Sequence, residues 1–266
     1  MEPLRIGFIG TGRIGRAIIA GLGRQKDAVM FGYDRDPGAV EAIAAAHPIT
    51  GCPSPAALAR EAKVIILAVK PYQIEEVLIE LRPSLSSDHL IVSVAAGISS
   101  EFIRKNALEE TRVVRVMPNT PAFVGEAMTA LCRGKMATEE DIAVARGLFS
   151  TIGRVAVLEE SQMDAATALS GSGPAYMFNI LDSLSEGGVR CGLSKEEALL
   201  LGAQTMLGAA RMVLSGTRSP EELKREVTTP GGTTEAGLRV MDERGIRAIL
   251  IDAVAAADAR SRELRK

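Results

Sequence analysis

The sequence predicts a two-part protein in which a doubly wound, parallel α/β sheet is followed by an all-helical domain. Over residues 1–158, short apolar runs alternate with helix-forming segments, which is typical of a parallel sheet with helices on both faces. Over residues 159–266, apolar residues recur almost only at helical spacing. We therefore expect an α/β domain over 1–158 and a helical domain over 159–266.

Short apolar runs in the first part are the predicted main strands. A run such as Val64–Val69 does not alternate apolar and polar residues, as expected for a strand covered on both faces. The runs are "LRIGFIG", "AVMFGYD", "VIILAVK", "LIVSVAA", "RVVRVMP" and "RVAVLE".

Helix starts are marked by residues that cap helix N-termini. A Ser, Thr or Asp before Pro, or three residues before an acidic residue, is typical of such a start. The predicted starts are at Asp36-Pro37, Ser54-Pro55, Thr138 with Asp141, Ser194 with Glu197, and Ser219-Pro220. The helix after Ser194 has apolar residues around most of its circumference, which indicates burial in an oligomer or in a large helical core.

Composition and charge exclude several classes of partner. The chain has 31 Lys and Arg against 33 Asp and Glu and only 3% aromatic residues, which argues against a nucleic-acid surface. No apolar run is long enough to cross a bilayer, and the N-terminus lacks a secretory pattern. The three cysteines are odd in number and too widely spaced for a CxxC metal site. We expect a soluble cytoplasmic protein without a metal, acting on a small molecule.

The stretch "GTGRIG" places Gly10, Gly12 and Gly15 between the first strand and a helix expected from about Ile14 to Arg24. In a dinucleotide-binding loop the three glycines allow a tight turn, close approach of a pyrophosphate, and helix packing. Asp34 at the end of the second strand matches the acidic residue of that motif. A Rossmann-type dinucleotide site is therefore predicted, with a ligand-free glycine-rich turn as the alternative.

Two neighbouring residues favour different cofactors. Asp34 can accept hydrogen bonds from a ribose 2′-hydroxyl and repels a 2′-phosphate, whereas Arg35 attracts that phosphate. Alternatively, Asp34 or Asp36 only caps the helix that begins at Pro37. These residues alone do not decide between NADP and NAD as the cofactor.

The ends of the later strands complete the expected cofactor site, because ligands of open α/β sheets bind there. Lys70 is expected near the phosphates or ribose, or else is a solvated loop residue. Two prolines flank Asn119-Thr120 and fix a rigid turn suited to placing a nicotinamide ring. The expected cofactor contacts are Ile9, Gly10, Thr11, Gly12, Arg13, Ile14, Gly15, Asp34, Arg35, Ala68, Val69, Lys70, Pro71, Ala95, Ala96, Met117 and Asn119.

The segment "VTTPGGTTEAG" interrupts the helical part with a proline and paired glycines. The helix expected from Thr233 to Glu243 would start with free N–H groups and a positive dipole end, which suits an anion. Alternatively, Thr233 or Thr234 is only an N-cap.

Along nearly its whole length the sequence resembles the pyrroline-5-carboxylate reductase family. The matching stretches include "IGFIGTGRIGRAI", "AVKP", "SVAAGI", "RVMPNTPAFVGEA", "ALSGSGPAY" and "VTTPGGTTEAGL". The resemblance implies an N-terminal Rossmann domain and a helical dimerisation domain, in a homodimer or a larger assembly of dimers. It also implies reduction of Δ1-pyrroline-5-carboxylate to L-proline with NADPH or NADH.

The resemblance also implies roles for the loop in the helical part. Gly231, Gly232, Thr233 and Thr234 would hold the substrate carboxylate on backbone N–H groups. Thr234 would lie close to the ring nitrogen and is the expected catalytic residue. The resemblance favours NADPH, but Ser54-Pro55 stands near where many members carry an asparagine, which together with Asp34 weakens a strict NADPH preference.

Other functions fit the same scaffold. A related imine or β-hydroxyacid reductase is one alternative, although the helical stretch "SGSGPAYMFNILDSLSEGG" lacks the lysine that a hydroxyacid enzyme needs. A regulatory protein that binds NAD(P) without turnover is another.

Overall fold

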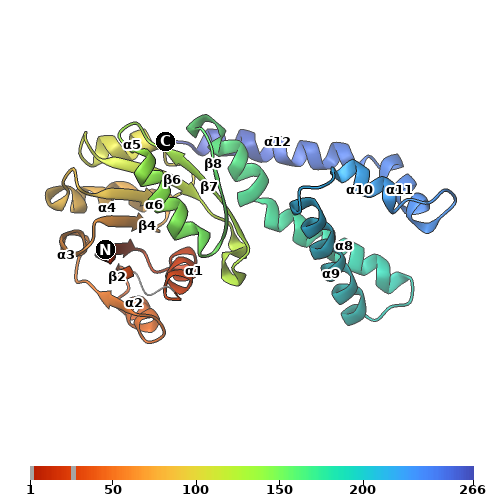
Figure 1. Cartoon of the computed structure of the whole chain (residues 1–266), viewed down its shortest axis with the longest axis horizontal. Coiled ribbons are helices and arrows are strands. Elements are labelled where there is room, and N and C mark those ends of the chain that lie inside the picture. Colours follow the sequence, from red (N-terminus) through yellow and green to blue (C-terminus); the bar gives the residue numbers. More distant parts are fainter. Residues whose placement is uncertain (1–2, 25–27) are drawn as a thin grey trace. The chain divides into compact units, whose positions relative to one another are not determined.

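The structure is a computed structural model that describes residues 3–24 and 28–266. Its contacts divide the chain into two compact units (Figure 1). The first comprises residues up to Ser172 together with Ala257–Lys266, and the second is Gly173–Ala256. The first unit contains a sheet with helices on both faces, and the second is helical.

Among the described residues, the first unit holds one eight-stranded sheet in the order β3-β2-β1-β4-β5-β6-β7-β8. All neighbouring strands run parallel except β6 and β7, which pair antiparallel. The strands are β1 (Leu4–Ile9), β2 (Ala28–Tyr33), β3 (Ile49–Gly51), β4 (Val64–Leu67), β5 (Leu90–Ser93), β6 (Arg112–Met117), β7 (Ala127–Arg133) and β8 (Gly153–Val157).

Successive residues of the central strands point to opposite faces and fill two separate cores. Phe8 and Ile66 belong to the core shared with α1 (Arg13–Leu22), α2 (Pro37–Ala44) and α6 (Glu139–Ser150). Ile65 and Leu67 belong to the core shared with α3 (Pro55–Glu61), α4 (Ile74–Leu81) and α5 (Ser100–Asn106). Burial on both sides confirms the interpretation of non-alternating strands.

The predicted helix starts in the first unit are confirmed by their side-chain hydrogen bonds. Asp36 accepts from Gly38 N–H at 3.0 Å, Ser54 accepts from Ala57 N–H at 3.1 Å, and Thr138 forms a capping box with Asp141. Asp36 rather than Asp34 therefore caps α2, which leaves Asp34 for another role. Helix α1 was expected at about 14–24 and instead spans Arg13–Leu22, and it is followed by a turn at Gly23 and Arg24.

Two strands were not predicted. Strand β3 has three residues, too few for a recognisable apolar run. Strand β7 follows the proline-rich turn, which forms the short helix η3 (Thr120–Val124), and it is absent from the predicted strands. It pairs antiparallel with β6, so the sheet is mixed rather than purely parallel.

The second unit consists of α8 (Gly173–Arg190), α9 (Lys195–Leu214), α10 (Pro220–Glu226), α11 (Thr233–Glu243) and most of α12 (Ile246–Leu264). Helices α8 and α9 approach closely where glycines face larger residues: a Cβ on Gly188 would lie 3.1 Å from Ala198, and one on Gly202 would lie 3.0 Å from Leu181. Many large apolar side chains of this unit are exposed, among them Phe178 and Leu200.

The last residues of the sequence pack within the first unit. The carboxylate of Asp164, in the short helix α7 (Met163–Ala166), is 1% exposed; it accepts a hydrogen bond from the Ser261 hydroxyl at 2.8 Å and pairs with Arg265 at 3.2 Å. Lys266 donates its N–H to Gly97 O at 2.7 Å and accepts from Ser99 N–H at 3.1 Å. These contacts, and the packing of Met163 in a small core beside β7, assign both segments to the first unit. The sequence-based boundary at residues 158/159 remains a prediction, and β8 ends at Val157.

The remaining short helices are η1 (Pro71–Gln73), η2 (Arg82–Ser84), η4 (Glu160–Gln162) and the π-helical η5 (Thr167–Gly171). None of the helices in the described ranges combines the length and apolarity needed to cross a membrane.

Candidate cofactor site and substrate loop

The loop between β1 and α1 has the backbone geometry of a dinucleotide-binding turn. Gly10 has a φ of +94°, and a Cβ there would lie 2.6 Å from the carbonyl oxygen of Ala68. A Cβ on Gly15 would lie 2.5 Å from the carbonyl oxygen of Gly10. A Cβ on Gly12 would meet no atom within 4 Å, so Gly12 borders open space. The loop therefore provides the tight turn, the helix packing and the gap for a pyrophosphate that the sequence predicts.

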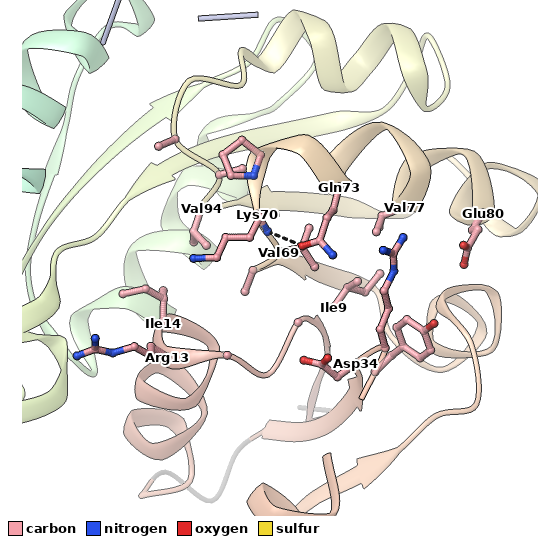
Figure 2. Close-up of a pocket in the computed structure, with 18 residues that line it drawn as sticks. Ile9, Arg13, Ile14, Asp34, Val69, Lys70, Gln73, Val77, Glu80 and Val94 are labelled. Atoms are coloured by element: carbon pink, nitrogen blue, oxygen red, sulfur yellow. Dashed lines mark hydrogen bonds between the residues drawn. The ribbon is translucent and has the colours of Figure 1, made fainter. Parts of the chain in front are cut away.

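A cavity of about 520 Å³ lies beside this loop, at the carboxyl ends of β1, β2, β4 and β5 (Figure 2). Its volume is in the range of ligand-binding clefts. Most of the predicted cofactor contacts line it: Ile9, Gly10, Gly12, Arg13, Ile14, Asp34, Arg35, Ala68, Val69, Lys70, Pro71, Ala95 and Ala96.

Four predicted contacts are not among the lining residues. Thr11 is fully buried, and Gly15 packs against Gly10. Met117 packs against the small core under β7. The Asn119 side chain donates to Ser170 O at 3.1 Å and accepts from Met128 N–H at 3.0 Å, which fixes the turn into η3. Direct contact of these four residues with the cofactor remains a prediction.

Five residues that line the cavity were not predicted from the sequence, namely Tyr33, Gln73, Val77, Glu80 and Val94. Gln73, Val77 and Glu80 repeat at helical spacing and lie along one wall of the cavity (Figure 2). The cofactor contacts were predicted from the carboxyl ends of the strands, so residues that reach the cavity from a helix were not among them. The spacing of these three residues after the "AVKP" turn is the pattern that would have identified them.

The Asp34 carboxylate organises the glycine loop. One oxygen accepts from the Thr11 backbone N–H at 2.7 Å and from the Thr11 hydroxyl at 3.0 Å. The other accepts from Asp36 N–H at 3.1 Å. Because Asp34 also lines the cavity, it can hold the loop and face a bound ribose at the same time.

Arg35 is already paired with an acidic residue. Its guanidinium forms a salt bridge with Glu76 of α4. The hydrogen bond that Arg35 donates to Glu76, together with the negative charge of Glu76, raises the pKa of Arg35 above its ordinary value, and Glu80 and Tyr33 add to the effect. The region around Arg35 therefore carries more negative than positive charge.

Lys70 and Arg13 provide the positive charge near the glycine loop. The Lys70 backbone N–H donates to the Gln73 side chain at 3.0 Å, and its ammonium group extends toward Val94 and Ile14 (Figure 2). No ion pair recorded among the described residues involves Lys70. The Arg13 guanidinium carbon lies 5.3 Å from the centroid of the Phe123 ring. This distance is within the limit of about 6 Å for a cation–π interaction.

The segment before α11 forms a tight turn. Gly231 has a φ of +75°, which favours glycine, and Gly232 is the N-cap. A Cβ on Gly232 would lie 2.5 Å from the Thr229 hydroxyl oxygen. Helix α11 spans Thr233–Glu243, as predicted, so Thr233 and Thr234 occupy its first turn.

Hydrogen bonds within this turn already occupy some of the backbone N–H groups that could bind an anion. Gly231 N–H donates to the Glu235 carboxylate at 2.7 Å, and Gly232 N–H donates to Thr229 O at 3.0 Å. Within the described ranges, the N–H groups of Thr233 and Thr234 have no recorded partner. The expectation that the N–H groups of Gly231 and Gly232 bind the anion therefore requires that their bonds to Glu235 and Thr229 be shared or broken.

Comparison with known proteins identifies the family. A model described as pyrroline-5-carboxylate reductase dimerisation matches residues 160–264, and one described as NADP oxidoreductase, coenzyme F420-dependent, matches residues 5–97. A pyrroline-5-carboxylate reductase from Methanosarcina acetivorans is 41% identical over 100% of both chains. The chain belongs to the pyrroline-5-carboxylate reductase family.

Solved structures of the family agree with this assignment. The pyrroline-5-carboxylate reductase from Coxiella burnetii superimposes with a TM-score of 0.93 at 36% identity and covers 98% of both chains. The Plasmodium falciparum enzyme, solved with NADP bound, gives a TM-score of 0.89 at 31% identity over 100% of both chains. The predicted family, fold class and NAD(P)-dependent oxidoreductase class are confirmed.

Proposed function

We propose that this member of the family reduces the cyclic imine Δ1-pyrroline-5-carboxylate to L-proline, with NADPH or NADH bound beside the glycine loop. The observation that carries the proposal is the open space at Gly12, next to a turn tied by Thr11 and Asp34, in a chain that matches the reductases from end to end. The bound cofactor supplies a hydride to the imine carbon. A proton added to the ring nitrogen completes the reduction, so the protein has mainly to orient the substrate and place charge.

The glycine-loop pocket is proposed to hold the dinucleotide. Gly12 leaves room for the pyrophosphate beside the N-terminus of α1, where backbone N–H groups favour an anion. Lys70 and Arg13 add positive charge to the cavity lining.

The loop before α11 is proposed to hold the substrate. The N–H groups of Thr233 and Thr234 lie in the first turn of α11, where the positive helix end favours a carboxylate. The Thr234 hydroxyl is proposed to form a hydrogen bond with the ring nitrogen. Gly231 and Gly232 contribute the turn that presents these groups.

Both dinucleotides are proposed to be used. Arg35 is the positive group next to the ribose end of the cavity, and it attracts a 2′-phosphate. Glu76 pairs with Arg35, and Asp34 adds a second carboxylate that favours a free 2′-hydroxyl. These opposing charges argue against strict selection of either cofactor.

A homodimer formed through the helical unit, alone or in a larger assembly of dimers, is the proposed assembly. Large apolar side chains such as Phe178, Leu184 and Leu200 are more than half exposed in this unit, which is more apolar surface than a monomer ordinarily leaves in water. The family model that matches residues 160–264 is named for dimerisation. The three cysteines form no disulfide, which suits the reducing cytoplasm proposed as the location.

Steady-state oxidation of NADPH and of NADH with Δ1-pyrroline-5-carboxylate tests this function. Turnover that forms proline supports it. Binding of NAD(P)H without turnover would indicate a regulatory protein. Turnover of a ring-expanded imine, or of a β-hydroxyacid with NAD(P)+, that is faster than turnover of Δ1-pyrroline-5-carboxylate would indicate a different substrate.

A further inference from the structure

Helices α9, α10 and α11 each carry a glutamate at the third helical position. In α11 this glutamate accepts a hydrogen bond from a different residue than in the other two helices. In α9, Glu197 accepts from the backbone N–H and hydroxyl of the N-cap Ser194 at 3.0 and 2.7 Å. In α10, Glu222 makes the same two contacts with Ser219, both at 2.7 Å. Each serine hydroxyl accepts from the glutamate N–H at 3.2 Å. These are closed capping boxes.

Helix α11 lacks this closure. Its N-cap is Gly232, which has no hydroxyl and whose N–H donates to Thr229 O. Glu235 therefore reaches one residue further back and accepts from Gly231 N–H at 2.7 Å. Gly231 has a left-handed backbone conformation, so this hydrogen bond holds the residue at which the loop turns.

Two consequences follow for the first turn of α11. Among the described residues, no N-cap hydroxyl accepts from the N–H of Glu235, so this group stays open in addition to those of Thr233 and Thr234. The Glu235 carboxylate is held behind the turn, away from those N–H groups, by its bond to Gly231. The anion-binding donors are thereby kept free of the protein's own carboxylate.

We infer that Glu235 is a positioning residue for substrate binding, one that holds Gly231 so that the first turn of α11 presents open N–H groups to the substrate carboxylate. This inference rests on the proposed role of the loop as the substrate site. The hydrogen bond, rather than the negative charge, carries the effect, because the charge is exposed and screened by solvent.

Alanine and glutamine variants separate the hydrogen bond from the charge. Glu235→Ala removes the acceptor and frees the Gly231 turn, so KM for Δ1-pyrroline-5-carboxylate should rise by about 2- to 10-fold, as expected for one net hydrogen bond. Its kcat and its Kd for NADPH should stay within about twofold of wild type, because the variant leaves the cofactor pocket intact. Glu235→Gln keeps an acceptor oxygen for the Gly231 N–H and removes only a charge that solvent already screens, so its KM should stay within about twofold of wild type.

Glu222→Ala is the matched control. It removes the same residue type from the same helical position, in a helix outside the substrate loop. Thermal unfolding should show a loss of Tm similar to that of Glu235→Ala, while KM stays at the wild-type value.

The outcomes separate failure of this inference from failure of the proposed function. A wild-type KM in Glu235→Ala, an equal rise in KM in Glu235→Gln, or an equal rise in Glu222→Ala overturns the positioning role. Thr234→Val serves as the reference for the loop. If it impairs turnover while Glu235→Ala does not, only the inference fails; if neither variant changes the kinetics, the substrate is bound elsewhere and the proposed loop function fails with it.

Discussion

The Thr234 hydroxyl is the side-chain group expected to contact the reacting ring nitrogen. Thr234→Val keeps the β-branched shape and removes the hydroxyl, so it should leave NADPH binding intact and lower kcat/KM. A hydrogen bond to a charged group contributes roughly 1.5–3 kcal/mol, which corresponds to roughly a 10- to 150-fold loss. Thr233→Val is the control, because the contribution proposed for Thr233 is a backbone N–H that valine retains. A larger loss at Thr233 would show that the threonines act only on the start of α11.

The Arg35–Glu76 pair should set the choice of cofactor. Glu76→Gln frees the guanidinium for a 2′-phosphate, so the ratio of kcat/KM for NADPH to that for NADH should rise, and Arg35→Ala should lower it. Steady-state kinetics with both cofactors give the ratio. Changes of less than about twofold in both variants, or about 0.4 kcal/mol, would show that the ribose is recognised by other groups.

The Cys132 thiol should make stability depend on pH under alkaline conditions. Burial, with a smaller contribution from Glu160, raises its pKa from 9.0 to about 12. Because the folded-state pKa is the higher one, the unfolded chain loses the proton first. Titration of Cys132 does not reduce the free energy of unfolding below pH 9. As the pH rises from 9 toward 12, the free energy of unfolding falls by about 1.4 kcal/mol per pH unit for this single proton.

Urea unfolding of wild type and Cys132→Ala at several pH values above 9 measures this effect. The variant loses packing at every pH but lacks the titrating thiol. The difference in free energy of unfolding between the two proteins should therefore shrink as the pH rises. A difference that stays constant would contradict a protonated thiol in the folded state.

At the scale of the element, the glycine loop contributes both to cofactor binding and to the stability of the fold, and substitutions at different glycines can separate the two. A Cβ at Gly12 meets no atom of the described residues within 4 Å, so Gly12→Val should fold with a Tm close to wild type and lose NAD(P)H binding. Gly10→Val should lose stability as well, because Gly10 has a positive φ and borders the carbonyl of Ala68. Fluorescence titration with NADPH and thermal unfolding test both variants. Near-normal NADPH affinity in a folded Gly12→Val protein would refute the assignment of the loop.

Elements with strong local determinants were predicted well. Helices α2, α3 and α6 begin at Pro or at a capping box, and α11 begins after a glycine pair, so local residues fix their starts. Strand β7 was missed because its antiparallel pairing with β6 depends on contacts that no local pattern specifies. Long-range pairing and short strands therefore mark the limit of prediction for the fold.

The same limit applies to the site. The glycine loop and the strand ends were predicted because parallel strands bring their carboxyl ends together. The α4 wall with Glu80 was missed because helix packing, rather than the strand rule, brings it to the cavity. The pairing of Arg35 with Glu76 also joins two elements distant in sequence, so residue types alone left the cofactor preference open.

At the scale of the whole molecule, the exposed apolar surface of the helical unit should form the dimer. Leu200 is 68% exposed, and Leu200→Glu should lower the molar mass measured by light scattering to that of the monomer. Ile79→Glu is the matched control, because Ile79 is 62% exposed but lies on α4 of the first unit. An unchanged mass in Leu200→Glu, or dissociation of Ile79→Glu, would place the interface elsewhere.

The packing of Ala257–Lys266 within the first unit has a consequence for biosynthesis. The ribosome completes the sheet and then the whole helical unit before it makes Ser261 and Arg265, the partners of the buried Asp164 carboxylate. Until then that carboxylate lacks both partners, and an unpaired buried charge is strongly destabilising, by about 3–5 kcal/mol when a buried pair is broken. We therefore expect α7 to pack fully in the first unit only after residues 257–266 have been synthesised.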